Sequence, residues 1–157
     1  MSPPEFDRFV ERAVPRRAAR LVARGVWSPT EALAASRAAY ARALPDGLAT
    51  SDQHFCHIVA VPGAPPVGEV WYSTRFEGGR VQFWVEWIWI EPEHRRRGYA
   101  TAALYRLEAE ARRRGATRCG LDVWMDNPGA VALYRKLGYA TTKASMVKEL
   151  APEGPAP

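Results

Sequence analysis

The stretch that decides the fold of this chain is Arg95-Arg96-Arg97-Gly98-Tyr99-Ala100. It follows the apolar run 84–90 (Trp-Val-Glu-Trp-Ile-Trp-Ile) and opens an amphipathic segment that continues to residue 114. A strand, a tight basic turn with glycine and then a helix bring free backbone N–H groups and the positive end of a helix dipole to one point. Gly98 lets the backbone come close to a ligand. The sequence therefore predicts a site for a phosphate-bearing ligand at this turn.

The spacing Arg-x-x-Gly-x-Ala is not that of the Gly-x-x-x-x-Gly-Lys-Ser/Thr phosphate loop, and the chain contains no Gly-x-Gly-x-x-Gly. A second pattern lies further along, where a strand over 118–125 leads into a short helix over 128–137. Together the two patterns resemble the GNAT-type N-acetyltransferases, whose motifs are Arg/Gln-x-x-Gly-x-Gly/Ala and Asn-x-x-Ala followed by Leu-Tyr-x-Lys-x-Gly-Phe/Tyr. Every fixed position of the second motif is filled here: Asn127, Ala130, Leu133, Tyr134, Lys136, Gly138 and Tyr139. The resemblance covers residues 54–150, and residues 1–53 only loosely.

The length of 157 residues is that of one domain, with 47% hydrophobic and 25% charged residues as in soluble globular proteins. We expect a single domain over 1–150, with cofactor-binding motifs at 85–114 and 119–140, and a disordered tail over 151–157. The longest apolar run is too short to span a membrane, and no secretory signal is visible at the N-terminus. These features predict a cytoplasmic protein that does not bind membranes.

The formal net charge of +5 suits an anionic ligand. No arginine-rich stripe interleaved with aromatic residues appears, so nucleic-acid binding is not expected. Cys56 and Cys119 match no metal-ligand spacing and are expected to be reduced structural thiols. His54 and His57 lie three apart in a predicted strand, so they should face opposite sides and do not form a metal pair.

The hydrophobic periodicity predicts a mixed α/β fold in which helices cover a mostly antiparallel sheet. Helices are expected over 4–24, in two pieces separated by Pro15, and from the capping box Ser28–Glu31 to about Leu44. The remaining expected elements are strands at 54–61, 67–74 and 80–90, a helix at 99–114, the strand and helix of the second motif, and a final strand within 142–150. The resemblance implies the GNAT fold, in which two central strands splay into a V-shaped gap. The pantetheine arm of acetyl-CoA would enter this gap by pairing with backbone groups near Ile88, Trp89 and Ile90.

The resemblance also assigns roles to the phosphate turn and to the start of the second helix. The pyrophosphate of acetyl-CoA would be held by residues from Arg95 to Thr101, mostly through backbone amides. Successive side chains cannot all face one ligand, so Arg95 and Arg97 are expected to contribute more than Arg96. A backbone N–H near Trp89 or Ile90 would polarise the thioester carbonyl. Asn127 is predicted to cap the helix that Pro128 opens, and the resemblance adds a bond to the pantetheine arm, next to Ala130.

Two side chains are candidates for proton transfer. Tyr134 has a phenol suited to protonate a leaving thiolate, the role that this tyrosine takes in the family, and core packing is the structural alternative. Glu86 is the candidate base. It should share a face with Ile88 and Ile90, and burial would raise its pKa, but an exposed charge on the strand is an equal alternative. Glu69 and Asp122 are further carboxylates near the expected acceptor side.

These features together predict an N-acetyltransferase that uses acetyl-CoA and moves the acetyl group directly to a primary amine of a small molecule or peptide. No metal is expected. A catalytically silent, GNAT-like module that senses acyl-CoA is the alternative from another class, and an enzyme with a longer acyl donor is a second one. The scattered acidic residues mildly disfavour aminoglycoside or polyamine acceptors. The oligomeric state is not determined by the sequence, although exposed strand edges are compatible with a homodimer.

Overall fold

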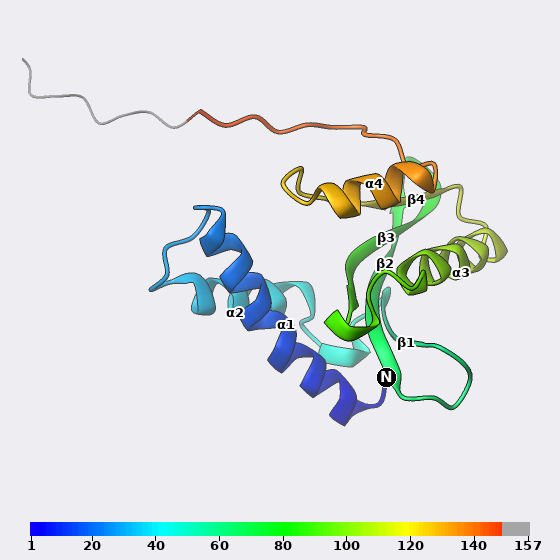
Figure 1. Ribbon diagram of the computed structural model, residues 1–157, viewed down its shortest axis with the longest axis horizontal. Coiled ribbons are helices and arrows are strands. Elements are labelled where there is room, and N and C mark those ends of the chain that lie inside the picture. Colours follow the sequence, from blue (N-terminus) through cyan, green and yellow to red (C-terminus); the bar gives the residue numbers. More distant parts are fainter. Residues whose placement is uncertain (149–157) are drawn as a thin grey trace, which may run out of the picture. The chain divides into compact units, whose positions relative to one another are not determined.

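The computed structural model describes residues 1–148, and the predicted tail 151–157 lies outside the described residues. Its helices and strands occur in the order α1 (Pro3–Ala23), α2 (Ala32–Ala43), β1 (Gln53–Val59), β2 (Pro66–Glu77), β3 (Arg80–Ile90), α3 (Tyr99–Arg113), β4 (Arg118–Leu121) and α4 (Pro128–Lys136) (Figure 1). Two short 3-10 turns, Gly47–Ala49 and Pro92–His94, complete the order. The chain forms two compact units, one over Met1–Asp122 and one that begins at Val123. Within residues 1–148 no helix is long and apolar enough to cross a bilayer.

Helix α1 is continuous, and the predicted break at Pro15 is wrong. A proline inside a helix removes one backbone hydrogen bond and costs about 3 kcal/mol. Here the ring points away from the core, and the opposite side of the helix is buried along its whole length. The buried residues are Phe6, Phe9, Ala13, Val14, Ala18 and Leu21. Their burial outweighs the local cost, because fully burying one such large side chain contributes about 1.5–3 kcal/mol.

The expected capping box of the second helix forms a turn before the helix. Ser28 Oγ donates to the Glu31 carboxylate at 3.0 Å, and the carbonyl of Ser28 accepts the amide of Ala32, where α2 begins. At the start of α1 the same pattern acts as a cap. There Ser2 donates to the Glu5 carboxylate from its amide, at 2.6 Å, and from its hydroxyl, at 2.9 Å.

The four strands form one sheet in the order β1-β2-β3-β4. The first two pairings are antiparallel, and β3 pairs with β4 in parallel. Strand β3 has the predicted bounds, whereas β4 ends at Leu121, four residues before the expected end at 125. The final strand predicted within 142–150 is absent from residues 142–148, and its last two residues lie outside the described part. Strand propensity is realised only where a neighbouring strand completes the hydrogen bonds, and no described strand pairs with this segment.

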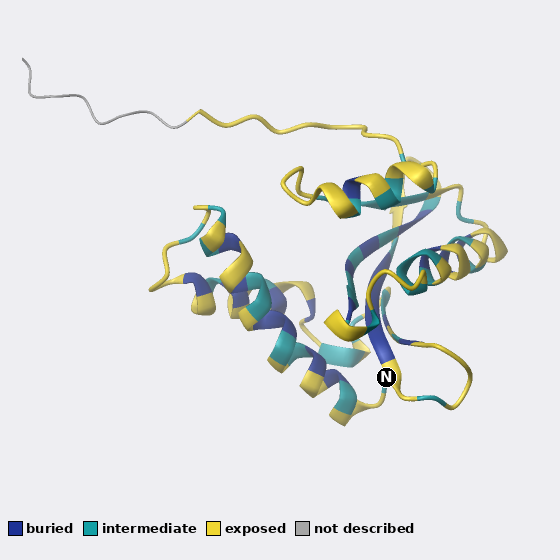
Figure 2. Ribbon diagram, in the orientation of Figure 1, coloured by how far each residue is buried: buried dark blue, intermediate teal, exposed yellow. Residues whose placement is uncertain are grey.

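The core of the first unit lies on both faces of the sheet. Helices α1 and α2 cover one face, where an aromatic cluster joins Phe6, Phe9, Tyr40, Phe55, Trp71 and Trp87. Helix α3 covers the other face, with Leu104, Leu107 and Ala111 buried (Figures 1 and 2). Tyr72 and Phe83 stack on the α3 side with their ring centroids 5.2 Å apart. With helices on both faces of the sheet, β3 contributes to both cores and leads directly into the turn at 95–98.

The second unit contains α4 and the residues around it. Asn127 caps α4 as predicted, because its Oδ1 accepts the amide of Ala130 at 3.2 Å and Pro128 occupies the first turn. The helix ends at Lys136, and Gly138, two residues further on, has a left-handed φ of 88°. The amide of Tyr139 donates to the carbonyl of Tyr134 at 3.0 Å. Both ends of this short helix are therefore determined by local hydrogen bonds.

Candidate active site

The turn between β3 and α3 presents a row of unused backbone donors. None of the amides of residues 96–101 donates a hydrogen bond to a described residue, and Gly98, at the N-cap position, has no side chain that could cap the helix. Arg96 and Gly98 both have left-handed backbones, with φ of 61° and 84°. Alternation of this kind turns successive N–H groups toward one point and forms an anion-binding concavity. The local geometry therefore agrees with the phosphate site predicted from the sequence.

The side chain of Arg95 is held by contacts with β3. Its Nε donates to the carbonyl oxygen of Ile90 at 2.9 Å, and its guanidinium lies 4.5 Å from the centroid of the Trp89 ring. The guanidinium of Arg16, from α1, lies 4.2 Å from the same centroid. The side chain of Arg97 is exposed and makes no hydrogen bond, ion pair or cation–π contact with the described residues. Of the two arginines expected to contact a ligand, Arg97 is thus the one with an unengaged side chain.

Strands β3 and β4 pair over only part of their length. The register joins Gln82 to Arg118 and continues to Val85 opposite Leu121, where it ends. Beyond this point the segment 86–90 pairs with β2 alone. One edge of Glu86–Ile90 is therefore left without a strand partner in the first unit, as expected for the start of a splay.

A β-bulge lies at the point where the pairing ends. Trp71 of β2 is opposite Trp87, but the next residue, Tyr72, is opposite Val85, so Glu86 is an extra residue in β3. A bulge of this kind shifts the alternation of side chains. Before it Val85 faces α3, and after it Trp87 faces α1 and α2. The partner of Ile88 is Val70, which lies two residues from Tyr72 and so shares the α3 face.

The predicted face of Glu86 is therefore wrong. Its carboxylate lies on the α1/α2 face, opposite to Ile88 and Ile90, because the bulge reverses the alternation between them. Ser73 Oγ donates to Glu86 Oε1 at 2.6 Å, and Arg75 Nη2 donates to the same oxygen at 2.7 Å. No described residue hydrogen-bonds to Oε2, and the side chain retains 24% of its exposure. Glu86 is thus a partly exposed, oriented carboxylate with one open oxygen.

Sequence reasoning missed the two residues that hold this carboxylate. Ser73 is 2% exposed, and Arg75 Nε donates to its hydroxyl at 3.2 Å. Arg75 also lies over the ring of Trp84, 4.5 Å from its centroid. The signal was present, because polar side chains at alternate positions 73 and 75 interrupt an aromatic strand. Their partner could not be found without the register of β3.

In the second unit, Tyr134 lies in the helix α4 that Asn127 caps. Burial raises the pKa of Tyr134, so its phenol stays protonated throughout the neutral range. The ring centroids of Tyr134 and Tyr139 are 5.8 Å apart, at an interplanar angle of 59°. The exposed fraction of Tyr134 is intermediate, so the side chain is not part of a closed core.

Comparison with known proteins agrees with these features. The sequence profile of the acetyltransferase (GNAT) family matches residues 23–139. The chain belongs to the GNAT acetyltransferase family. The N-acetyltransferase YdgE of Bacillus subtilis is 31% identical over 166 residues, which cover 96% of this chain and 95% of YdgE.

Solved structures extend the comparison to the fold. The crystal structure of the acetyltransferase YycN of Bacillus subtilis superposes with a TM-score of 0.90 at 27% identity, covering 97% of this chain and 96% of YycN. An aminoglycoside acetyltransferase from an uncultured soil metagenomic sample reaches a TM-score of 0.51 at 26% identity, with 74% of each chain covered. The family, its fold and an acetyltransferase activity are therefore shown for this enzyme.

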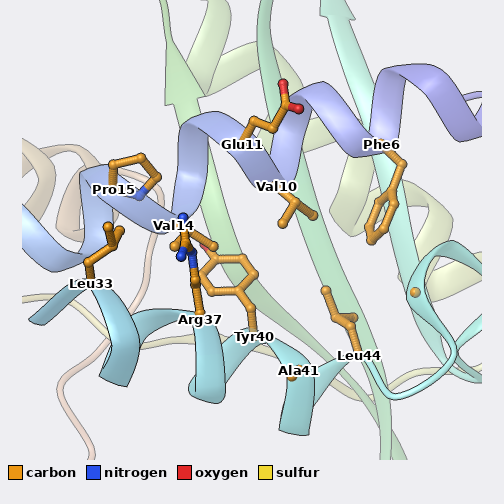
Figure 3. A pocket seen from close by; sticks show the side chains of 11 residues that line it. Phe6, Val10, Glu11, Val14, Pro15, Leu33, Arg37, Tyr40, Ala41 and Leu44 are labelled. Atoms are coloured by element: carbon orange, nitrogen blue, oxygen red, sulfur yellow. The ribbon is translucent and has the colours of Figure 1, made fainter. Parts of the chain in front are cut away.

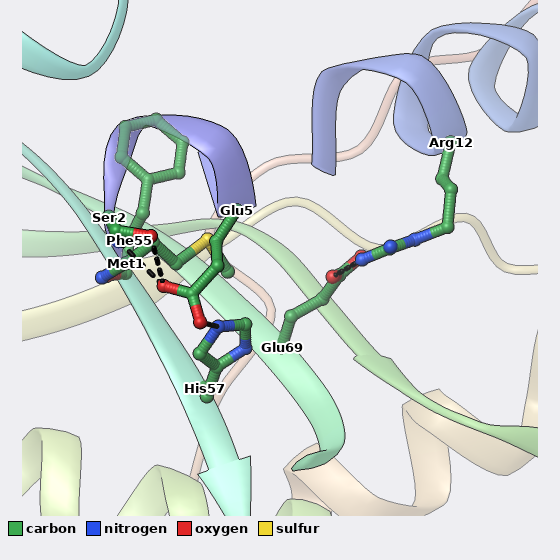
Figure 4. A network of polar contacts seen from close by, with 7 residues as sticks. All are labelled: Met1, Ser2, Glu5, Arg12, Phe55, His57 and Glu69. Atoms are coloured by element: carbon green, nitrogen blue, oxygen red, sulfur yellow. Dashed lines mark hydrogen bonds and ion pairs between the residues drawn. The ribbon is translucent and has the colours of Figure 1, made fainter. Parts of the chain in front are cut away.

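Two cavities in the first unit of the acetyltransferase lie away from Glu86 and from the turn at 95–101. One, of about 550 Å³, lies between α1 and α2, and Figure 3 shows its apolar side chains. The other, of about 280 Å³, is polar and lies beside the network in Figure 4. There Arg12 Nη2 pairs with Glu69 Oε2 at 2.5 Å, and His57 lies 3.3 Å from Glu5. Glu69 is 3% exposed, so this carboxylate, which the sequence suggested for the acceptor side, is buried in an ion pair with α1.

The tryptophans and histidines of the sheet have structural contacts in this acetyltransferase. Trp71 and Trp87 lie in the aromatic core, and Trp84 covers Gly120, where an added Cβ would lie 2.3 Å from the ring. His54 stacks on Tyr72, whereas His57 contacts α1, so the two histidines face opposite sides as expected. In the described part of the chain, no three His, Cys, Asp or Glu side chains are grouped as metal ligands would be.

Proposed function

We propose that this acetyltransferase takes the acetyl group from acetyl-CoA and transfers it directly to a primary amine of a small molecule or peptide, in a ternary complex. The observation that carries the proposal is the row of unbonded amides over 96–101, at the positive end of α3. The pyrophosphate of acetyl-CoA would accept from these amides, with Arg97 adding a charged contact. The amides of Tyr99, Ala100 and Thr101 belong to the first helical turn, which has no intrahelical partners for its donors.

The pantetheine arm would pair with the free edge of β3. Ile88 has backbone groups on this edge, whereas those of Trp89 point to β2 and the carbonyl of Ile90 already accepts from Arg95. The bulge at Glu86 would hold the thioester, and a nearby backbone N–H would polarise its carbonyl. Asn127 and Ala130 would contact the arm from α4. Because the proposal takes residues from both units, it requires residues 1–150 to act as one domain.

The proposed reaction needs a proton acceptor and a proton donor. Glu86 Oε2 takes one proton from the acceptor ammonium, directly or through water, which leaves a neutral amine. The amine nitrogen then forms a bond to the acetyl carbon, and the bond from this carbon to sulfur breaks. Tyr134 donates its phenolic proton to the departing thiolate and regains one from the acylated nitrogen through solvent. The products are the N-acetyl compound, the free thiol of CoA and one proton.

Direct transfer needs neither a metal nor an acetylated enzyme. A covalent route would require a reactive thiol. Burial, together with the charge of Glu108, raises the pKa of Cys119, which disfavours the thiolate that such a route needs.

Release of free thiol from acetyl-CoA in the presence of a panel of amines tests the proposal, with CoA binding measured separately by calorimetry. We expect binding of CoA and amine-dependent thiol release. Binding without release from any amine would support the silent sensor instead. Faster release from a longer acyl-CoA would change the donor but keep the reaction. The variant Glu86→Gln should bind CoA normally and lose most of its turnover at neutral pH.

A further inference from the structure

The ion pair of Arg75 and Glu86 has a fixed geometry. The guanidinium of Arg75 is held from three directions: by the ring of Trp84 at 4.5 Å, by Ser73 Oγ at 3.2 Å and by Glu86 Oε1 at 2.7 Å. These contacts use Nε and Nη2. No described residue accepts a hydrogen bond from Nη1, and the side chain is 44% exposed. Arg75 thus has a charged donor group that is both oriented and open to solvent.

The carboxylate of Glu86 is likewise oriented and partly open to solvent. Ser73 and Arg75 both bond to Oε1 of Glu86, which leaves Oε2 as its open atom. The hydroxyl of Ser73 is buried, so its bond to Oε1 is protected from competition with water. The pair therefore presents one open acceptor, Glu86 Oε2, next to one open donor, Arg75 Nη1.

We infer that Arg75 determines acceptor specificity and selects an amine that has a carboxylate close to it, as in a free amino acid. A zwitterion has the charges of this ion pair in reverse order. Its ammonium would bind Oε2 of Glu86, where the proton is removed, and its carboxylate would bind Nη1 of Arg75. The inference rests on the proposed function, because it takes Glu86 as the base.

The charges of Arg75 and Glu86 also disfavour some classes of acceptor. The charge of Glu86 is already balanced by Arg75, so an acceptor with several ammonium groups finds no net negative charge there. A fixed guanidinium repels a second cation close to the reacting amine. An amine without a carboxylate leaves Nη1 without a partner but meets no repulsion. The expected order is therefore amino acids first, simple amines next and aminoglycosides last.

The experiment compares kcat/KM for thiol release between matched acceptors. Each of several free L-amino acids is paired with its amide and with the amine formed by its decarboxylation, and one aminoglycoside is added. We expect the amino acids to exceed their partners by 10-fold to 100-fold, the range expected for one charged hydrogen bond. In Arg75→Gln the ratio of kcat/KM between an amino acid and its partners should fall to about 1. This ratio is informative even if kcat falls for all acceptors because Glu86 is less well oriented. Arg75→Lys, which keeps the charge but loses the planar donor group, should retain part of the preference.

The matched control is Arg80→Gln, which lies beside the turn of the same hairpin, opposite Glu77, and should keep the wild-type preference. A wild-type ratio near or below 1 would overturn the inference, as would a preference that survives in Arg75→Gln. If Arg75→Gln does not fold, the wild-type ratio and the lysine variant still decide the question. Failure of the proposed function is distinguishable, because it would abolish thiol release with every acceptor, whereas failure of this inference changes only their order.

Discussion

Arg95 donates a hydrogen bond from Nε to the carbonyl oxygen of Ile90, the last residue of β3. The guanidinium also packs on Trp89, so the first residue of the turn at 95–98 is attached to the strand that precedes it. Arg16 packs on the same ring from α1. The position of the turn is therefore determined by contacts with the sheet and with the first helix, in addition to its own glycine.

Replacement of Arg95 by alanine should destabilise the protein and weaken CoA binding together. Loss of the hydrogen bond and of the contact with Trp89 is expected to lower the free energy of unfolding by about 1–2 kcal/mol. Arg97→Ala should weaken CoA binding with little change in Tm, because the exposed side chain of Arg97 makes no hydrogen bond, ion pair or cation–π contact with the described residues. Thermal unfolding and calorimetric titration with CoA measure both effects. Equal changes in Tm for the two variants would contradict the assignment.

Gly98→Ala should affect CoA binding far more than stability. At φ of 84° a Cβ costs about 1 kcal/mol of unfolding free energy, and nothing lies within 4 Å of its position. A ligand bound at the turn amides would meet the new methyl group, so we expect the Kd for CoA to rise at least 10-fold. Gly63→Ala is the matched control, with φ of 81° and an equally open surrounding. An equal loss of CoA affinity in both variants would refute a binding site at Gly98.

Tyr134→Phe should lower kcat about 100-fold or more while the Kd for CoA changes little, because only the proton donor is removed. Thiol release measured at saturating acetyl-CoA gives kcat, and calorimetric titration gives the Kd for CoA. The control is Tyr105→Phe, which removes the hydroxyl of an exposed tyrosine on α3 and should behave like the wild type. Unchanged turnover in Tyr134→Phe would remove this residue from the mechanism.

Tyr40 should make the fold sensitive to alkaline pH. Burial is the main cause that raises its pKa to about 12, and the nearby charge of Glu69 adds to it. Since the folded pKa exceeds the unfolded value near 10, this stabilisation is complete below pH 10 and is lost as the pH rises to 12. The loss amounts to about 2–3 kcal/mol. Urea titrations between pH 8 and pH 12 should show a shallower decline in Tyr40→Phe, and an identical slope would show that Tyr40 is not responsible.

Gly120→Ala should destabilise the pairing of β4 with β3. An added Cβ would lie 2.3 Å from the ring of Trp84, so the ring or the strand must move, at a cost of about 1–3 kcal/mol. At Gly129, in the first turn of α4, the nearest atom to an added Cβ is 3.9 Å away. Gly129→Ala should therefore be neutral or slightly stabilising. Chemical denaturation measures the unfolding free energy of both variants. Equal values for the two would show that Trp84 does not cover β4.

Local sequence was sufficient for the parts of the site whose hydrogen bonds join near neighbours. The cap of Asn127 on Ala130 spans three residues, and the left-handed backbone at Gly98 depends on the absence of a side chain at that position. The bounds of β3 were also predictable, because its apolar run lies between a Gly-Gly turn and a proline. The break expected at Pro15 failed for the opposite reason, since burial against the sheet outweighed a local preference.

The amino-acid sequence by itself determined the strand, the turn and the helix around Gly98, and with them the family. Only the tertiary structure decided which face Glu86 occupies, because one extra residue in the register between β2 and β3 reverses every side chain beyond it. That register depends on pairing between distant segments, and so do the contacts of Glu86 with Ser73 and Arg75. The physical reason is that turns and caps are short-range, whereas register is a property of the whole sheet.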